Sequence, residues 1–153
     1  MEIMLTLALP RDQLSVPVVR SILRHSLLTL GTTEDCVSDI GIALTEACTN
    51  VLDHARGSSE YEVAAGIDGS TCVIQVIDRG AGFDGDPVER GDAAEDGRGL
   101  LLMRALVDKV TFTNRPTEGT VVHLEKQLTF EPGAVATQLD QRPLAGGPWS
   151  DPK

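Results

Sequence analysis

The stretch TTEDCVSDIGIALTEACTNVLDHA, residues 32–55, begins with a capping-box pattern and continues with apolar residues at helical spacing. This pattern predicts one long helix with a single buried face. Glu46, Asn50 and Asp53 follow one another at about one helical turn, so we expect them to share the exposed face. The apolar positions of the helix are Val37, Ile40, Leu44, Ala47, Val51 and Ala55.

The exposed face of this helix carries two side chains with useful chemistry. The amide oxygen of Asn50 is a hard ligand of the kind that Mg²⁺ accepts, together with water and phosphate oxygens. The Glu46 carboxylate lies one turn away and can orient or deprotonate a nucleophile, which is worth about 10²–10⁴ in rate. For His54, near the end of the same stretch, we expect a structural hydrogen bond and no phosphorylation.

The other segments alternate between strand and helix patterns. Alternating apolar residues predict a strand that Pro10 ends, and the dipeptide Asp68-Gly69 predicts a hairpin. A stretch without periodicity then predicts a long loop, of the kind that is usually functional in a compact domain. The expected order is strand 3–9, helix 15–30, helix 32–55, strands 61–67 and 71–77, loop 80–97, helix 99–110, and strands 110–113 and 120–128.

This order predicts the fold class and the extent of the domain. We expect a two-layer α/β sandwich, in which a mixed, mostly antiparallel sheet is covered by helices on one face. The domain is predicted to span residues 1–128. Residues 129–153 are rich in Pro and Gly and lack an apolar period, so we expect a disordered tail there.

Asp78 comes directly after an apolar strand, in the segment DRGAG at residues 78–82. A carboxylate at this point can accept a hydrogen bond from the exocyclic amino group of adenine, whereas guanine presents a carbonyl there. Gly80 and Gly82 permit a close approach of backbone to ligand. The segment GAGFDG at residues 80–85 also matches a dinucleotide-binding fingerprint, but the acidic, Pro-containing stretch that follows cannot open the required helix.

The segment GRGL at residues 97–100 opens the next predicted helix. Free N–H groups at a helix N-terminus favour phosphate, with roughly 0.3–2 kcal/mol from the helix dipole. Arg98 can add a charged contact to such a phosphate. Thr120, in the pair Gly119-Thr120 near the last strand, is a further candidate hydroxyl for the same site.

Composition excludes several classes of function. The formal net charge of −10 argues against nucleic acid, which needs clustered Lys and Arg. No segment approaches the roughly 18 apolar residues of a membrane span. The N-terminus lacks the pattern of a signal peptide, and Cys36, Cys48 and Cys72 are typical of buried, reduced thiols in a cytoplasmic protein.

Three segments in this order resemble the nucleotide-binding boxes of the GHKL (Bergerat-fold) ATPases. EACTN at residues 46–50, DRGAG at 78–82 and GRGL at 97–100 look like the N, G1 and G2 boxes. The resemblance implies ATP and Mg²⁺ as ligands, with Asn50 on the metal, Glu46 as the base and Asp78 on adenine. It places the following residues around the nucleotide: Asn50, Asp78, Gly80, Gly82, Gly97, Arg98, Gly99, Leu100 and Thr120.

Within this superfamily, the chain is similar to the bacterial anti-sigma-factor serine/threonine kinases. The stretch GLLLMRALVDKV at residues 99–110 is similar to the segment G-L-x-L-[MI]-[RK]-x-L-x-D-x-V of that branch. The resemblance implies a cytoplasmic homodimer that sequesters a sigma factor. It also implies transfer of phosphate from ATP to a serine of a STAS-domain anti-sigma factor antagonist.

Two alternatives remain open on the sequence. The first is a non-catalytic module of the same fold, which binds a sigma factor or antagonist and has a weak or vestigial nucleotide site. The second is a free-standing ATPase that acts on small molecules and releases phosphate without a protein partner.

Overall fold

A five-stranded antiparallel sheet forms one layer of the molecule. The computed structural model describes residues 1–54, 59–78, 96–115 and 119–141. Every neighbouring pair of strands in the order β1-β2-β3-β5-β4 is antiparallel. The strands are β1 (Glu2–Pro10), β2 (Glu60–Asp68), β3 (Thr71–Asp78), β4 (Lys109–Arg115) and β5 (Gly119–Gln127).

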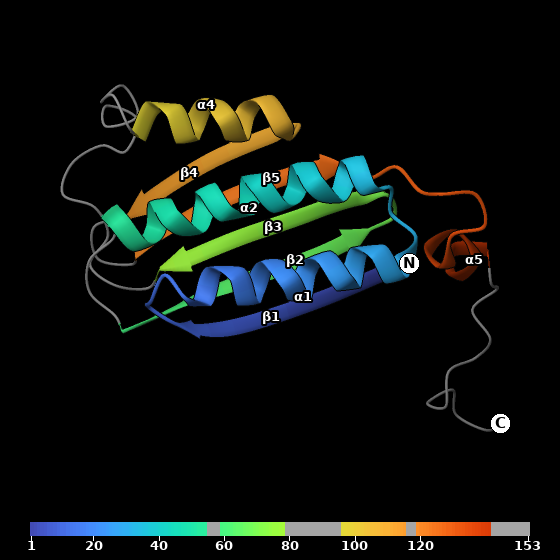
Figure 1. Ribbon diagram of the computed structural model, residues 1–153, viewed down its shortest axis with the longest axis horizontal. Coiled ribbons are helices and arrows are strands. Elements are labelled where there is room, and N and C mark those ends of the chain that lie inside the picture. The colour runs from blue at the N-terminus through green and yellow to red at the C-terminus, as the bar shows by residue number, and fades with distance from the viewer. Residues whose placement is uncertain (55–58, 79–95, 116–118, 142–153) are drawn as a thin grey trace, which may run out of the picture.

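Helices cover one face of this sheet, as Figure 1 shows. They are α1 (Ser15–Leu30), α2 (Glu34–His54) and α4 (Asp96–Leu106), while α5 (Val135–Gln141) lies at one end of the molecule. The predicted two-layer α/β sandwich is therefore confirmed. The sheet was expected to be mixed, but in the described residues all of its neighbouring strand pairs are antiparallel.

Helix α2 is the centre of the core. Five of its predicted apolar residues are buried, whereas Ala55 lies outside the described residues. Alternate residues of β2 and β3 face the helices, as the strand period requires. The residues of α2 with no exposed surface are Ala43, Leu44, Ala47, Cys48 and Val51.

The start of α1 has no capping side chain. The helix begins at Ser15, but its N-cap position is Leu14, which makes no side-chain cap hydrogen bond. The Ser15 hydroxyl instead lies 2.6 Å from the Asp12 carbonyl and 2.6 Å from the Tyr61 hydroxyl. The Ser15 and Tyr61 hydroxyls are both buried where α1 packs against β2, so each needs a hydrogen-bond partner within the protein.

Residues 129–141 correct part of the expected tail. They contain α5, and Ala134 and Ala136 are buried. The Met1 ammonium group lies 2.6 Å from the Asp140 carboxylate. Apolar periodicity is too short to detect over a helix of 7 residues, and packing against the end of α1 orders it. Residues 142–153 lie outside the described part, and the domain limit at residue 128 stays a prediction.

Helix length and hydropathy bear on membrane association. Over the ranges that the structure describes, no helix is long and apolar enough to cross a bilayer.

Gly31 and Gly69 give a test of how α5 is held. Both have positive φ, 91° and 61°, so alanine at either position should lose roughly 1–2 kcal/mol of unfolding free energy. A Cβ at Gly31 would also lie 2.8 Å from the Ala134 Cα, whereas Gly69 has open space around it. We expect Gly31→Ala to lose about 1–3 kcal/mol more than Gly69→Ala in urea unfolding. Equal losses would show that the segment at Ala134 accommodates the added Cβ at no cost.

The buried thiols give a second test. Burial raises the pKa of Cys48 to about 12 and that of Cys72 to about 12. Each folded-state pKa lies above the unfolded value. The contribution of the two protonated thiols to the free energy of unfolding is therefore complete below about pH 8.5 and declines as pH rises toward the folded-state pKa. At about pH 8, we expect a thiol reagent to label Cys48 and Cys72 only after denaturant unfolds the protein. Rapid labelling in the native state, located by peptide mass spectrometry, would contradict this burial.

Candidate functional site

Five chain segments that are distant in sequence meet at one end of the molecule. In Figure 1 this is the end at which β1, α2 and β3 finish and α4 and β5 begin. Helix termini at such a place present unpaired backbone groups, and strand ends present side chains without a further ladder. The segment between β3 and α4 starts and ends here, and its residues 79–95 lie outside the described part.

Asp78 and Thr120 form the floor of this site. They are directly opposite each other in the β3–β5 register, and neither residue has exposed surface. The Thr120 hydroxyl is buried and has no hydrogen-bond partner among the described residues. Such an unsatisfied group costs about 1–3 kcal/mol, so the Thr120 hydroxyl beside the buried Asp78 carboxylate is a candidate to hydrogen-bond a ligand.

Arg11 pairs with Asp78, and the sequence analysis missed it. Its Nη1 lies 2.5 Å from Asp78 Oδ2, and its Nη2 donates to the carbonyl oxygens of Val51 at 3.0 Å and Leu52 at 3.4 Å. The ion pair joins residues 67 positions apart in the chain. No local spacing could reveal it; the available signal is an arginine immediately after a strand that ends near the site.

Glu46 lies against the first turns of α4. A Cβ placed on Gly99 would be 2.9 Å from Glu46 Oε2, so the end of the Glu46 side chain lies directly against the backbone of α4. The carboxylate is thereby next to the N-terminal part of α4, where the helix dipole favours negative charge. The structure thus brings the predicted base and the predicted phosphate-binding helix together.

The remaining members of the predicted set take different positions. Asn50 is half-buried on α2, one turn after Glu46, and Asp53 is exposed further along the helix. Leu100 packs against the hydrophobic core, while Arg98 is exposed. Gly97 lies in the first turn of α4. Gly80, Gly82 and the acidic loop lie outside the described residues, as does the side chain of His54.

The donor set fits magnesium better than a transition metal. Among the described residues, no group of three or more His, Cys, Asp and Glu side chains could hold a metal ion. Asn50 offers one hard oxygen, and Mg²⁺ commonly takes one or two protein ligands and completes its shell with water and phosphate oxygens. Asn50 therefore suits a magnesium ion that is also bound by phosphate oxygens.

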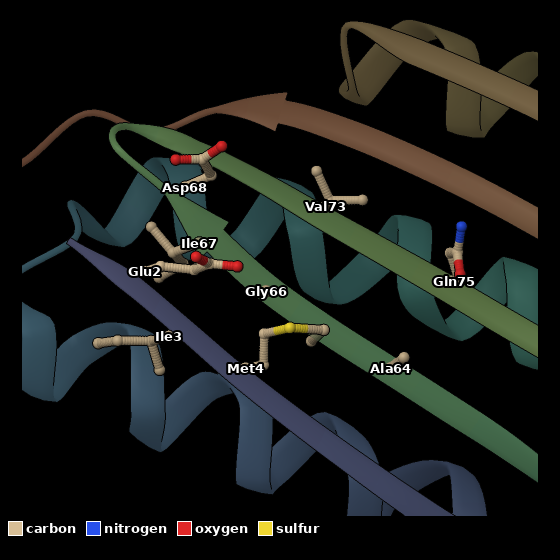
Figure 2. Close-up of a pocket in the computed structure, with 10 residues that line it drawn as sticks. Glu2, Ile3, Met4, Ala64, Gly66, Ile67, Asp68, Val73 and Gln75 are labelled. Carbon is tan, nitrogen blue, oxygen red and sulfur yellow. The ribbon is translucent and has the colours of Figure 1, made fainter.

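A hollow elsewhere in the structure does not contain the predicted residues. A hollow of about 260 Å³ is lined by residues of β1, β2 and β3. Figure 2 shows that Met4, Val73 and Gln75, among its lining residues, are on the sheet face turned away from the helices. A second hollow, of about 470 Å³, includes Lys109 and His123 on the same sheet. In the described part of the chain, the candidate site is therefore separate from both hollows.

A family model gives the first comparison with known proteins. The model described as the histidine kinase-like ATPase domain matches residues 9–126. This range includes Glu46, Asn50, Asp78 and Thr120, and it begins two residues before Arg11.

Individual relatives give a narrower comparison. The chain is 32% identical to serine-protein kinase RsbW of Halalkalibacterium halodurans, over 89% of this chain and 94% of that protein. It is 30% identical to serine-protein kinase RsbW of Bacillus subtilis, over 76% of this chain and 80% of that protein.

Solved structures support the same fold. The structure of the RsbU and RsbW domains of Rv1364c from Mycobacterium tuberculosis has a TM-score of 0.66 and 25% identity, over 82% of this chain and 32% of that chain. The histidine kinase domain from Erythrobacter litoralis EL346 has a TM-score of 0.50 and 18% identity over 88% of this chain and 66% of that chain, which shows the fold alone.

The unpartnered Thr120 hydroxyl generates a stability prediction. Thr120→Val removes a buried group that costs free energy, and we expect it to raise the unfolding free energy of the ligand-free protein by about 1 kcal/mol. Thr32 is the matched control, since its buried hydroxyl also lacks a described partner and Thr32→Val should have a similar effect. Thermal unfolding of both variants measures this; a destabilised Thr120→Val would mean that the hydroxyl already has a partner.

Proposed function

Because this chain belongs to the histidine kinase-like ATPase domain family, with RsbW serine-protein kinases among its relatives, we propose that it is an ATP-dependent anti-sigma-factor serine kinase. It would bind ATP with Mg²⁺ and phosphorylate a serine of a STAS-domain antagonist. In the absence of that antagonist, the protein would sequester a sigma factor. We further infer a cytoplasmic homodimer.

The observation that carries this proposal is the convergence of two pairs at one end of the sheet. Glu46 meets Gly99 at the start of α4, and Asp78 lies opposite Thr120 on adjacent strands. The first pair combines a base with a helix terminus suited to phosphate. The second combines an acceptor for an amino group with a hydroxyl that lacks a partner. The two pairs suit opposite ends of one nucleoside triphosphate.

Each residue then has a defined task. Asp78 accepts a hydrogen bond from the adenine amino group, and Asn50 holds Mg²⁺, which supplies charge neutralisation of the phosphates when it is bound. The backbone N–H groups from Gly97 to Leu100 hold phosphate oxygens at the N-terminus of α4, with Arg98 available from the exposed side. Glu46 accepts the proton of the substrate serine and orients its hydroxyl.

The alternative is a sequestering module that binds its protein partner without transferring phosphate. The acidic surface expected from a net charge of −10 would serve a basic partner in either case. The two functions differ in one measurable event, which is the appearance of phosphoserine on the partner.

Glu46→Gln tests the kinase. We expect it to keep ATP affinity within about threefold while phosphate transfer to a STAS-domain antagonist falls by about 10²–10⁴. The measurement is phosphoserine formed per minute with ATP and Mg²⁺, beside calorimetric ATP binding. Asp53→Asn is the matched control, since it neutralises an exposed carboxylate on the same helix.

Three results would count against the kinase. Transfer that persists in Glu46→Gln would remove Glu46 from the chemistry. Tight sigma binding by the native protein, with ATP bound and no phosphoserine formed on any of the antagonists tested, would favour the sequestering module. Phosphate release in the absence of any protein partner would indicate a free-standing ATPase.

A further inference from the structure

Arg11 connects two parts of the candidate site that no local segment could connect. Its guanidinium contacts the Asp78 carboxylate at one nitrogen and the last turn of α2 at the other. The side chain is 17% exposed and that of Asp78 is fully buried. We propose that Arg11 is a positioning residue that sets the adenine selectivity of this protein by fixing the Asp78 carboxylate. This inference rests on the proposed function, since it concerns how ATP is recognised.

The backbone of Arg11 is itself held in place. Its N–H donates to the Ser59 carbonyl oxygen at 2.8 Å, which extends the β1–β2 ladder by one bond beyond the pair Pro10–Glu60. The side chain therefore leaves from a fixed point at the end of the sheet. The side chain is thus anchored at both ends and loses its freedom on folding. Only the rigid, planar guanidinium fork of arginine can contact the Asp78 carboxylate and the helix carbonyl oxygens at the same time.

The contact with α2 has a consequence for the metal end of the site. Val51 and Leu52 directly follow Asn50, and their carbonyl oxygens are at the C-terminal end of the helix, where a cation is favourable. Arg11 thus ties the turn that carries the magnesium ligand to the strand end that carries Asp78. The separation between the metal and the adenine acceptor becomes fixed before a nucleotide arrives.

The ion pair between Arg11 and Asp78 has a consequence for the recognition of adenine. A buried carboxylate needs a positive partner, and Arg11 supplies it through Oδ2. With that oxygen held, rotation of the carboxylate about χ2 is restricted and its acceptor directions are set. A pre-oriented acceptor separates adenine from purines that lack the amino group more sharply than a mobile one does.

A gate that Arg11 opens and closes is the competing interpretation of the same pair. Opening would require the loss of the contacts to Asp78, Val51 and Leu52, while the Arg11 N–H stayed bonded to Ser59. The gate and the positioning role predict opposite changes. Removal of a gate raises ATP affinity, whereas removal of a positioning residue lowers the preference for adenine.

The test compares ATP with purine riboside triphosphate, which differs by the missing amino group. Calorimetry with Mg²⁺ on the full 153-residue chain measures both affinities. For the native protein we expect ATP to bind roughly 10- to 100-fold more tightly, as a hydrogen bond to a charged group allows. In Arg11→Ala that ratio should fall at least about tenfold, mostly through weaker ATP binding. Arg24→Ala is the control, because Arg24 on α1 forms an exposed pair with Glu34 on α2 and should keep the native ratio.

Arg11→Lys keeps the test decisive if Arg11→Ala fails to fold. Lysine retains the charge but cannot hold the carboxylate and the helix carbonyls through one planar fork, so we expect an intermediate ratio. A native ratio in either variant would overturn the positioning role, and tighter ATP binding in either would establish the gate instead. A native protein that binds neither nucleotide, or binds both equally, would count against the proposed function and not specifically against Arg11.

Discussion

The burial of one face of α2 is the constraint on which the rest of the structure depends. Its residues Ala43, Leu44, Ala47, Cys48 and Val51 have no exposed surface and pack into the core beneath the helices. Once that face is fixed, Glu46 and Asn50 lie at its margin, where both side chains are partly exposed. The same packing therefore stabilises the fold and orients the side chains that the proposed function uses.

The site is assembled from element ends because an antiparallel sheet brings ends together. Where β3 finishes, β5 begins, so Asp78 and Thr120 are opposite one another although they belong to different hairpins. The helices add their own termini at this end of the molecule, with opposite electrostatic character. The C-terminal turn of α2 accepts hydrogen bonds from Arg11, and the N-terminal turn of α4 has the Glu46 carboxylate beside it. The packing of these elements thus forms a site in which the Thr120 hydroxyl has no hydrogen-bond partner among the described residues.

Several features of the fold could be predicted because the signals are local. The apolar stripe of α2, the alternation of β1 to β3 and the Asp68-Gly69 turn all depend on residues within a few positions of one another. The contacts of residues 129–141 were not predictable in this way. The Gly31 carbonyl accepts a hydrogen bond from the Glu131 N–H, and Thr32 forms a β-bridge with Phe130. Contacts with the end of α1 therefore order this segment.

The sequence by itself determined the class of fold, the two faces of α2 and the residue types that suit a nucleotide and magnesium. It did so because hydrophobic period and turn chemistry are properties of neighbouring residues. Only the tertiary structure decided that Arg11 pairs with Asp78, that Glu46 reaches Gly99 and that Thr120 is buried without a described partner. These contacts join positions far apart in the chain, and they follow from strand register and helix packing, which local patterns constrain but do not specify.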